Sequence, residues 1–253
     1  MRAKYLIILL ALWLNVSAAQ SEPTTYDFDT EAGTLAVTPV GHGSLRLELN
    51  DTVIHVDPYS EVADYSQQPD ADWVWITHEH GDHLDPAALQ EVVTDATRFV
   101  MDSRSAEAYR SESGASGGEA DNITVLANGE SIEVDGLTLQ AVPAYNIVQE
   151  RDGGQKYHPE GWYNGYVLEI GDFRLHIGGD TECVPEVAAL ENITVSFLPT
   201  NLPYTMPPEE TATCYKVMQP EIAVPYHQGE SKAQVVADLL TPSDIDVRVL
   251  ELP

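Results

Sequence analysis

The stretch Trp73-Val-Trp-Ile-Thr-His-Glu-His-Gly-Asp-His-Leu-Asp-Pro86 decides both the fold and the chemistry expected of this chain. Its first four residues are bulky and apolar without polar alternation, which predicts a buried strand. Asp85 and Pro86 are typical of a helix N-cap and a first-turn proline, so a helix is expected to begin there. The intervening loop concentrates histidines and carboxylates, which indicates a metal site rather than a solvated turn.

The spacing within this loop predicts two neighbouring metal positions. His78 and His80 are two residues apart, so both imidazoles can reach one ion from an extended segment. Gly81 lacks a Cβ atom and is expected to let the chain turn sharply. Asp82 and His83 can then face a second ion beside the first.

The residues from Thr77 to His83 match the T-H-x-H-x-D-H signature of the metallo-β-lactamase superfamily, which this chain therefore resembles. A longer pattern is similar to the ascorbate-6-phosphate lactonase-like and phospholipase-D-like branch of that superfamily. It comprises Val142 to Asn146, Lys156 to Gly161, Gly178 to Thr181, Tyr204 to Met206 and Val224 to His227.

The order of the expected elements agrees with this resemblance. In each half of the chain, β-hairpins come first and strand–helix units follow. This order predicts an α/β protein built as a four-layer αββα sandwich, with two mixed β-sheets face to face and helices outside. Residues 20–32 are polar and are expected to form a loose leader before the first strand, at residues 34–40.

Two further residues follow strands and are candidates for the same site. Asp180 comes after two glycines, where a carboxylate can bridge two cations, and His227 follows the expected strand at residues 222–225. The resemblance implies that His78 and His80 bind one metal. It also implies that Asp82, His83 and His227 bind the other and that Asp180 bridges them. Asp82 and Asp180 are the candidate catalytic carboxylates.

One ligand of the first metal departs from the superfamily pattern, because Asn146 stands where a third histidine is expected. An asparagine carbonyl is a harder donor than imidazole, which favours Mn²⁺ or weakens Zn²⁺ binding. His158 on the same loop is the alternative donor, although a substrate contact or an ordinary loop position fits it as well. The expected cofactor is a pair of divalent ions, Zn²⁺ first and Mn²⁺ second.

Four other residues are candidates for supporting roles. His42 is expected to carry a proton, contact substrate or make a structural hydrogen bond, and Asp57 to orient a ligand. Tyr204 is a candidate for the pocket rim, and Lys156 for holding an anionic group. Glu79 is expected to point to solvent, because it alternates with two ligands on an extended segment.

Composition and the N-terminal segment indicate the compartment. Twelve basic and 41 acidic residues give a net charge of −29, which argues against a nucleic-acid partner. Residues 1–19 resemble a signal peptide, so we expect one domain over residues 20–253 that is periplasmic or secreted, without a stable membrane anchor. An oxidising compartment permits a bond between Cys183 and Cys214, but the sequence does not show that they are close.

The sequence thus predicts an exported metal-dependent hydrolase acting on a small molecule. Metal-activated water is expected to cleave an ester, lactone or phosphodiester-type bond. Two alternatives stay open: a non-catalytic metal- or ligand-binding protein on the same fold, and a β-lactam hydrolase.

Overall fold

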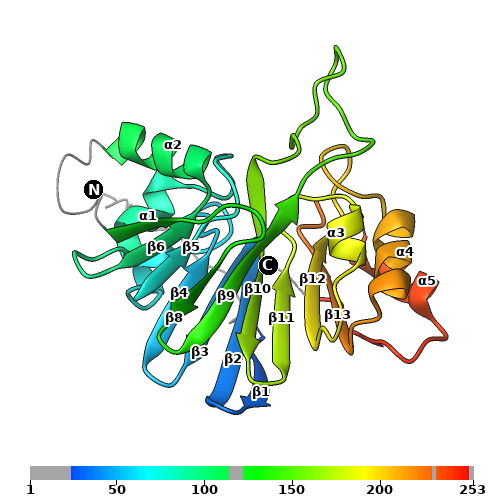
Figure 1. Cartoon of the computed structure of the whole chain (residues 1–253), viewed down its shortest axis with the longest axis horizontal. Coiled ribbons are helices and arrows are strands. Elements are labelled where there is room, and N and C mark those ends of the chain that lie inside the picture. Colours follow the sequence, from blue (N-terminus) through cyan, green and yellow to red (C-terminus); the bar gives the residue numbers. More distant parts are fainter. Residues whose placement is uncertain (1–23, 114–121, 230–231, 251–253) are drawn as a thin grey trace, which may run out of the picture.

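The computed structural model describes residues 24–113, 122–229 and 232–250. Two seven-stranded sheets pack face to face, with helices on their outer surfaces (Figure 1). The predicted αββα sandwich is therefore confirmed. The signal peptide expected at residues 1–19 lies outside the described residues. Among the described helices, none is long and apolar enough to cross a membrane.

The first sheet has the strand order β1-β2-β3-β4-β5-β6-β7, so neighbours in sequence are neighbours in the sheet. Strands β1 to β4 pair antiparallel, and β4 to β7 pair parallel. The sheet is thus mixed, as expected from hairpins followed by strand–helix units. Its strands are β1 Tyr26–Thr30, β2 Gly33–Gly41, β3 Ser44–Leu49, β4 Thr52–Val56, β5 Trp73–Trp75, β6 Arg98–Met101 and β7 Ile123–Val125.

The second sheet repeats this plan in the order β14-β13-β12-β11-β10-β9-β8. Strands β8 to β11 pair antiparallel, and β11 to β14 pair parallel. Its strands are β8 Ser131–Val134, β9 Leu137–Ala144, β10 Tyr163–Ile170, β11 Phe173–Ile177, β12 Val195–Pro199, β13 Ile222–Tyr226 and β14 Asp246–Val247.

The helices cover the outer faces of the two sheets (Figure 1). Helices α1 and α2 lie outside the first sheet, and α3, α4 and α5 lie outside the second. Asp85 caps α1 by accepting the N–H of Ala87 at 2.9 Å, and Pro86 is its first residue, as predicted. The helices are α1 Pro86–Val92, α2 Ser103–Ser113, α3 Pro185–Ala188, α4 Pro208–Met218 and α5 Ala233–Leu240, with a 3₁₀ turn at Tyr65–Gln67.

Three hydrophobic cores hold the layers together. The largest lies between the sheets and contains Trp75, Tyr166 and Phe197, all of them buried. The other two lie between each sheet and its helices. The Cys183–Cys214 disulfide, with Cα atoms 5.5 Å apart, ties the loop before α3 to helix α4.

The structure corrects the expected N-terminal leader. Residues 20–32 were expected to be loose, but Tyr26–Thr30 forms edge strand β1, paired antiparallel with β2. Tyr26 and Phe28 alternate with exposed aspartates and pack against the core between the sheets. This short period-two pattern is the signal that identifies a strand buried on one side.

Candidate metal centre

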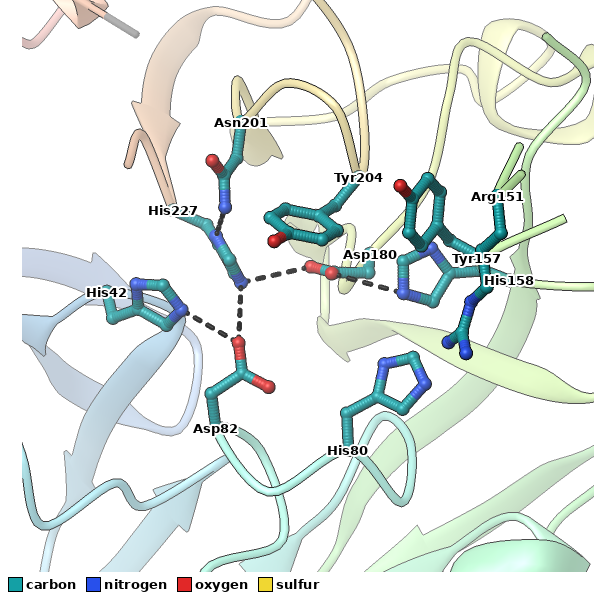
Figure 2. A pocket seen from close by; sticks show the side chains of 10 residues that line it. All are labelled: His42, His80, Asp82, Arg151, Tyr157, His158, Asp180, Asn201, Tyr204 and His227. Carbon is teal, nitrogen blue, oxygen red and sulfur yellow. Dashed lines mark hydrogen bonds and ion pairs between the residues drawn. The ribbon is translucent and has the colours of Figure 1, made fainter. Parts of the chain in front are cut away.

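The candidate site lies where the loops after several strands of both sheets converge. The loop after β5 supplies one side, and the loops after β9, β11, β12 and β13 supply the other. The turn between β2 and β3 adds His42 (Figure 2). Binding and catalytic residues often lie on loops that rigid strands hold in place.

Three histidines form the first group. His78 and His80 come from the loop after β5, and His158 comes from the loop between β9 and β10. His78 Nε2 lies 3.0 Å from His80 Nδ1. One nitrogen from each of the three rings lies within 4.8 Å of the others. Two nitrogens bound to the same zinc ion are about 3 Å apart, so this spacing fits a shared ion.

The second group contains Asp82, His83 and His227. His83 Nε2 lies 3.0 Å from His227 Nε2. Asp82 Oδ2 lies 3.7 Å from His227 Nε2 and 3.8 Å from His83 Nε2. His42 Nε2 lies 2.9 Å from the same Asp82 oxygen. The structure therefore adds His42 to the residues around a second metal position, where the sequence suggested only a supporting role.

Asp180 lies between the two groups and faces each with a different oxygen. Its Oδ2 is 3.2 Å from His158 Nε2, and its Oδ1 is 3.2 Å from His227 Nε2. Both His158 Nε2 and Asp180 Oδ1 are buried without a well-aligned hydrogen bond to any described residue. Buried polar atoms need partners, and a cation on each side of Asp180 would supply them. The donors on either side of Asp180 therefore fit divalent metal ions.

Asp57 contacts His83 of the second group through the ring nitrogen that faces away from the site. Its Oδ2 lies 2.8 Å from His83 Nδ1 and accepts the Thr77 hydroxyl at 2.6 Å. Its Oδ1 accepts the Thr77 backbone N–H at 2.8 Å. All three residues are fully buried. The contact leaves Nε2 of His83 directed at the site, as expected for a group that orients a metal ligand.

Asn146 does not line the pocket. Its side-chain oxygen accepts the backbone N–H of His158 at 2.7 Å and lies 3.0 Å from the ring Nδ1 of the same residue. Its amide nitrogen donates to the backbone oxygen of Tyr204 at 2.8 Å and to Glu182 Oε1 at 3.2 Å. The alternative donor suggested by the sequence, His158, is the residue that presents a nitrogen to the first group.

Three residues of the site have left-handed backbone conformations although none is glycine. The φ angles of His42, Asp57 and His227 are 50°, 46° and 44°. Such conformations are uncommon for residues other than glycine and concentrate at functional sites, where the surrounding packing imposes them. Hydrogen bonds from Thr77 hold Asp57, and the rings of His42 and His227 contact each other with centroids 3.7 Å apart.

Glycine is required beside these histidines, but at a different position from the one expected. A Cβ atom at Gly43 would lie 3.0 Å from His83 Cε1 and 3.2 Å from His227 Cδ2. A Cβ atom at Gly81 would meet nothing within 4 Å. The chain does turn at Gly81, as expected, because the His83 N–H donates to His80 O at 2.9 Å, but the φ angle of Gly81 is not positive and the turn does not require a glycine.

Three histidines of the site, His78, His80 and His42, are favoured in their neutral forms. Burial lowers the pKa of His78 well below its usual value, with a further contribution from nearby His83. Burial also lowers the pKa of His80 and of His42. Neutral imidazole is the form that binds a metal ion, so this environment favours coordination.

His83 and Asp180 are instead favoured in their charged forms. Burial lowers the pKa of His83, but Asp180 and Asp57 outweigh it and raise this pKa to about 9. Burial raises the pKa of Asp180, yet His227 and His83 hold it well below its usual value. Ionised carboxylates in a buried site stabilise positively charged groups beside them, so the site is suited to a cation.

A cavity of about 500 Å³ opens onto both groups. Figure 2 shows the residues that line it: His42, His80, Asp82, Arg151, Tyr157, His158, Asp180, Asn201, Tyr204 and His227. Three of these lining residues were not expected from the sequence: Arg151, Tyr157 and Asn201. Asn201 Nδ2 lies 3.1 Å from His227 Nδ1. Its position in the loop that follows strand β12 is the signal that could have identified it.

Two predicted side-chain positions differ from the structure. Lys156 does not line the cavity; its ammonium group donates to Val148 O at 3.0 Å and pairs with Glu150 at 3.3 Å. Glu79 does not simply point to solvent, because Oε1 accepts from the Tyr163 hydroxyl at 3.0 Å and from Arg104 at 3.1 Å. In both cases a nearby opposite charge or donor decides where the side chain lies.

Comparison with known proteins agrees with this geometry. The family described as the beta-lactamase superfamily domain matches residues 36–227, which include every residue of both groups. The chain belongs to the metallo-β-lactamase superfamily. The class of enzyme predicted from the sequence, a metal-dependent hydrolase, is confirmed together with the superfamily.

Individual relatives cover most of the chain. A UPF0173 metal-dependent hydrolase from Methanopyrus kandleri is 28% identical over 202 residues, 77% of this chain and 84% of that protein. A solved structure of a metal-dependent hydrolase from Parabacteroides distasonis is 39% identical and has a TM-score of 0.80. It covers 91% of this chain and 100% of its own. A Zn-dependent hydrolase of the superfamily from Thermotoga maritima, 17% identical with a TM-score of 0.55, shares the fold. It covers 84% of this chain and 96% of its own.

Proposed function

We propose that this superfamily member is an exported hydrolase that holds two divalent ions, preferably Zn²⁺, and cleaves an ester, lactone or phosphodiester-type bond. The observation that carries the proposal is Asp180, whose two oxygens face two separate histidine groups. In this assignment His78, His80 and His158 hold one ion. Asp82, His83 and His227 hold the other.

The chain's own residues would prepare the site for hydrolysis. Two bound divalent ions would lower the pKa of water and polarise the bond to be cleaved. Asp180 sets the distance between the two positions, and Asp57 fixes the orientation of His83. His42 lines the cavity with its ring on Asp82, so it is placed to contact the substrate beside that carboxylate.

The size of the cavity supports a small-molecule substrate. A volume of about 500 Å³ lies within the range typical of small-molecule sites. The net charge of −29 disfavours polyanionic nucleic acids.

Two features support export. Residues 1–19 have the pattern of a signal peptide, and we propose that the mature chain begins near residue 20. The Cys183–Cys214 disulfide is of the kind that persists in an oxidising compartment such as the periplasm or the exterior.

The proposal is tested by metal analysis together with turnover. The mature protein, purified without chelator, is expected to contain close to two ions per chain. It is expected to hydrolyse members of a panel of lactones, aryl esters and bis-aryl phosphodiesters, with a β-lactam included. Asp180→Ala and His227→Ala should lower turnover by about a thousandfold or more.

A matched control variant shows whether a loss of activity is specific to the site. Asp172→Ala changes an exposed aspartate in the turn between β10 and β11 and should leave both metal content and turnover unchanged. One ion per chain with no turnover on the panel would support a non-catalytic metal-binding protein instead. Full activity in Asp180→Ala would contradict the bridging role.

A further inference from the structure

Arg151 lies over the cavity together with two tyrosines. Its guanidinium carbon is 5.3 Å from the centre of the Tyr157 ring, which itself meets the Tyr204 ring edge-to-face at 5.1 Å. In Figure 2 the guanidinium group hangs beside Tyr157 on the side of the cavity nearest His80. A cationic group and two aromatic rings therefore border the metal centre at one end of the cavity.

Within the described part of the protein, Arg151 contacts an aromatic ring but forms no ion pair with a carboxylate. Six other basic side chains form ion pairs with carboxylates: Arg46, Arg98, Arg104, Lys156, Arg174 and Arg248. Arg151 has no such pair among the described residues, in a chain with 41 acidic residues. An arginine that pairs with no described carboxylate and lines the cavity is available for an anion that enters from outside.

The loop that carries Arg151 is fixed at its base. Glu182 is buried and accepts the backbone N–H groups of Ile147, Val148 and Gln149 at 2.8, 2.6 and 2.6 Å. Further along, the Arg151 N–H donates to Gln155 O at 2.7 Å, which closes the tip of the loop. The arginine is thus held near the cavity by the backbone, and less ordering is needed when a ligand binds.

We propose that the substrate carries a second anionic group, a carboxylate or a phosphate, remote from the bond that is cleaved, and that Arg151 binds this group. The inference rests on the proposed function, because the bond itself is taken to lie at the two metal positions. Tyr157 and Tyr204 would flank the part of the substrate between its two ends. Arginine matches carboxylate and phosphate oxygens through paired N–H donors, so either anion fits.

The experiment measures binding of non-hydrolysable probes by isothermal titration to the zinc-loaded mature protein. Phenylphosphonate places one anionic group at the metal centre. Para-phosphonobenzoate and para-phenylenediphosphonate add a carboxylate or a second phosphonate at the far end of the ring. At least one of the two should bind about tenfold more tightly than phenylphosphonate, and whichever gains more identifies the anion.

Substitutions test whether Arg151 causes this gain in affinity. Arg151→Gln should abolish the advantage of the second anion and leave phenylphosphonate binding unchanged. Arg110→Gln, which changes an exposed arginine on helix α2, should keep the advantage. Equal affinity for all probes in the wild type, or an advantage that survives Arg151→Gln, would overturn the inference while the metal centre stands. If no phosphonate binds, the proposed metal chemistry fails and the inference with it.

Discussion

Asn146 contacts His158 through a single oxygen in two ways: Oδ1 accepts the backbone N–H of His158 at 2.7 Å and lies 3.0 Å from its ring Nδ1. A carbonyl oxygen can only accept, so Nδ1 carries a proton, and in the neutral ring Nε2 is then the nitrogen that offers a lone pair to a cation. That Nε2 is the atom that faces Asp180. The asparagine that departs from the superfamily pattern therefore positions a histidine from further along the chain.

This relationship predicts different effects for the two residues. His158→Ala should remove one of the two ions per chain and lower turnover by about a thousandfold or more, because a direct ligand is lost. Asn146→Ala should keep both ions at saturation but weaken metal affinity by about 10–100-fold, because only the orientation of a ligand is lost. Metal titration against a competing chelator measures both. Equal loss of metal in the two variants would mean that Asn146 is itself a ligand.

The two glycines near the site predict a matched pair of variants. Gly43→Ala places a methyl group 3.0 Å from His83 Cε1, so metal affinity should fall by at least tenfold while the circular dichroism spectrum stays unchanged. Gly81→Ala meets open space, so metal affinity should not change and stability should stay equal or rise by about 0.4–1 kcal/mol. Loss of metal in Gly81→Ala would contradict this description of the loop.

The disulfide predicts a stability effect that is separate from catalysis. Cys183 and Cys214 are 31 residues apart, and a bond closing a loop of this length stabilises by about 2–4 kcal/mol. The double variant Cys183→Ala/Cys214→Ala should show this decrease in urea unfolding while it keeps its metal content. Single variants at either position serve as controls and should match the double variant. An unchanged unfolding free energy would mean that the bond does not form in solution.

A buried histidine outside the metal centre predicts how stability depends on pH. Burial lowers the pKa of His55 to about 4, and its Nε2 lies 3.0 Å from Pro69 O, to which it donates. Below pH 6.5 the unfolded chain takes up a proton at His55 that the folded chain refuses until about pH 4. As the pH is lowered from 6.5 to 4, His55 should therefore reduce the unfolding free energy by about 1.4 kcal/mol for each pH unit.

His55→Gln separates this contribution from the other titrating groups. The glutamine amide can still donate to Pro69 O but does not titrate. A plot of unfolding free energy against pH should be shallower in this variant between pH 6.5 and 4, whatever its stability at neutral pH. Parallel plots for the two proteins would show that His55 does not contribute.

The parts of the site that the sequence determined are close together along the chain. His78 with His80, and Asp82 with His83, are set by spacing on one short loop between a buried strand and a capped helix. The order of hairpins and strand–helix units also determined the αββα sandwich, because each element must bury one apolar face. Edge strand β1 was missed because its alternating pattern is only five residues long.

Only the tertiary structure decided which distant residues meet. Asn146 contacts His158 across 12 residues, Asp57 reaches His83 across 26, and His83 reaches His227 across 144. No local spacing encodes these contacts, since they depend on how the two sheets bring their loops to one edge. The same packing places Arg151 rather than Lys156 on the cavity, because Lys156 pairs with Glu150 while Arg151 stacks on Tyr157.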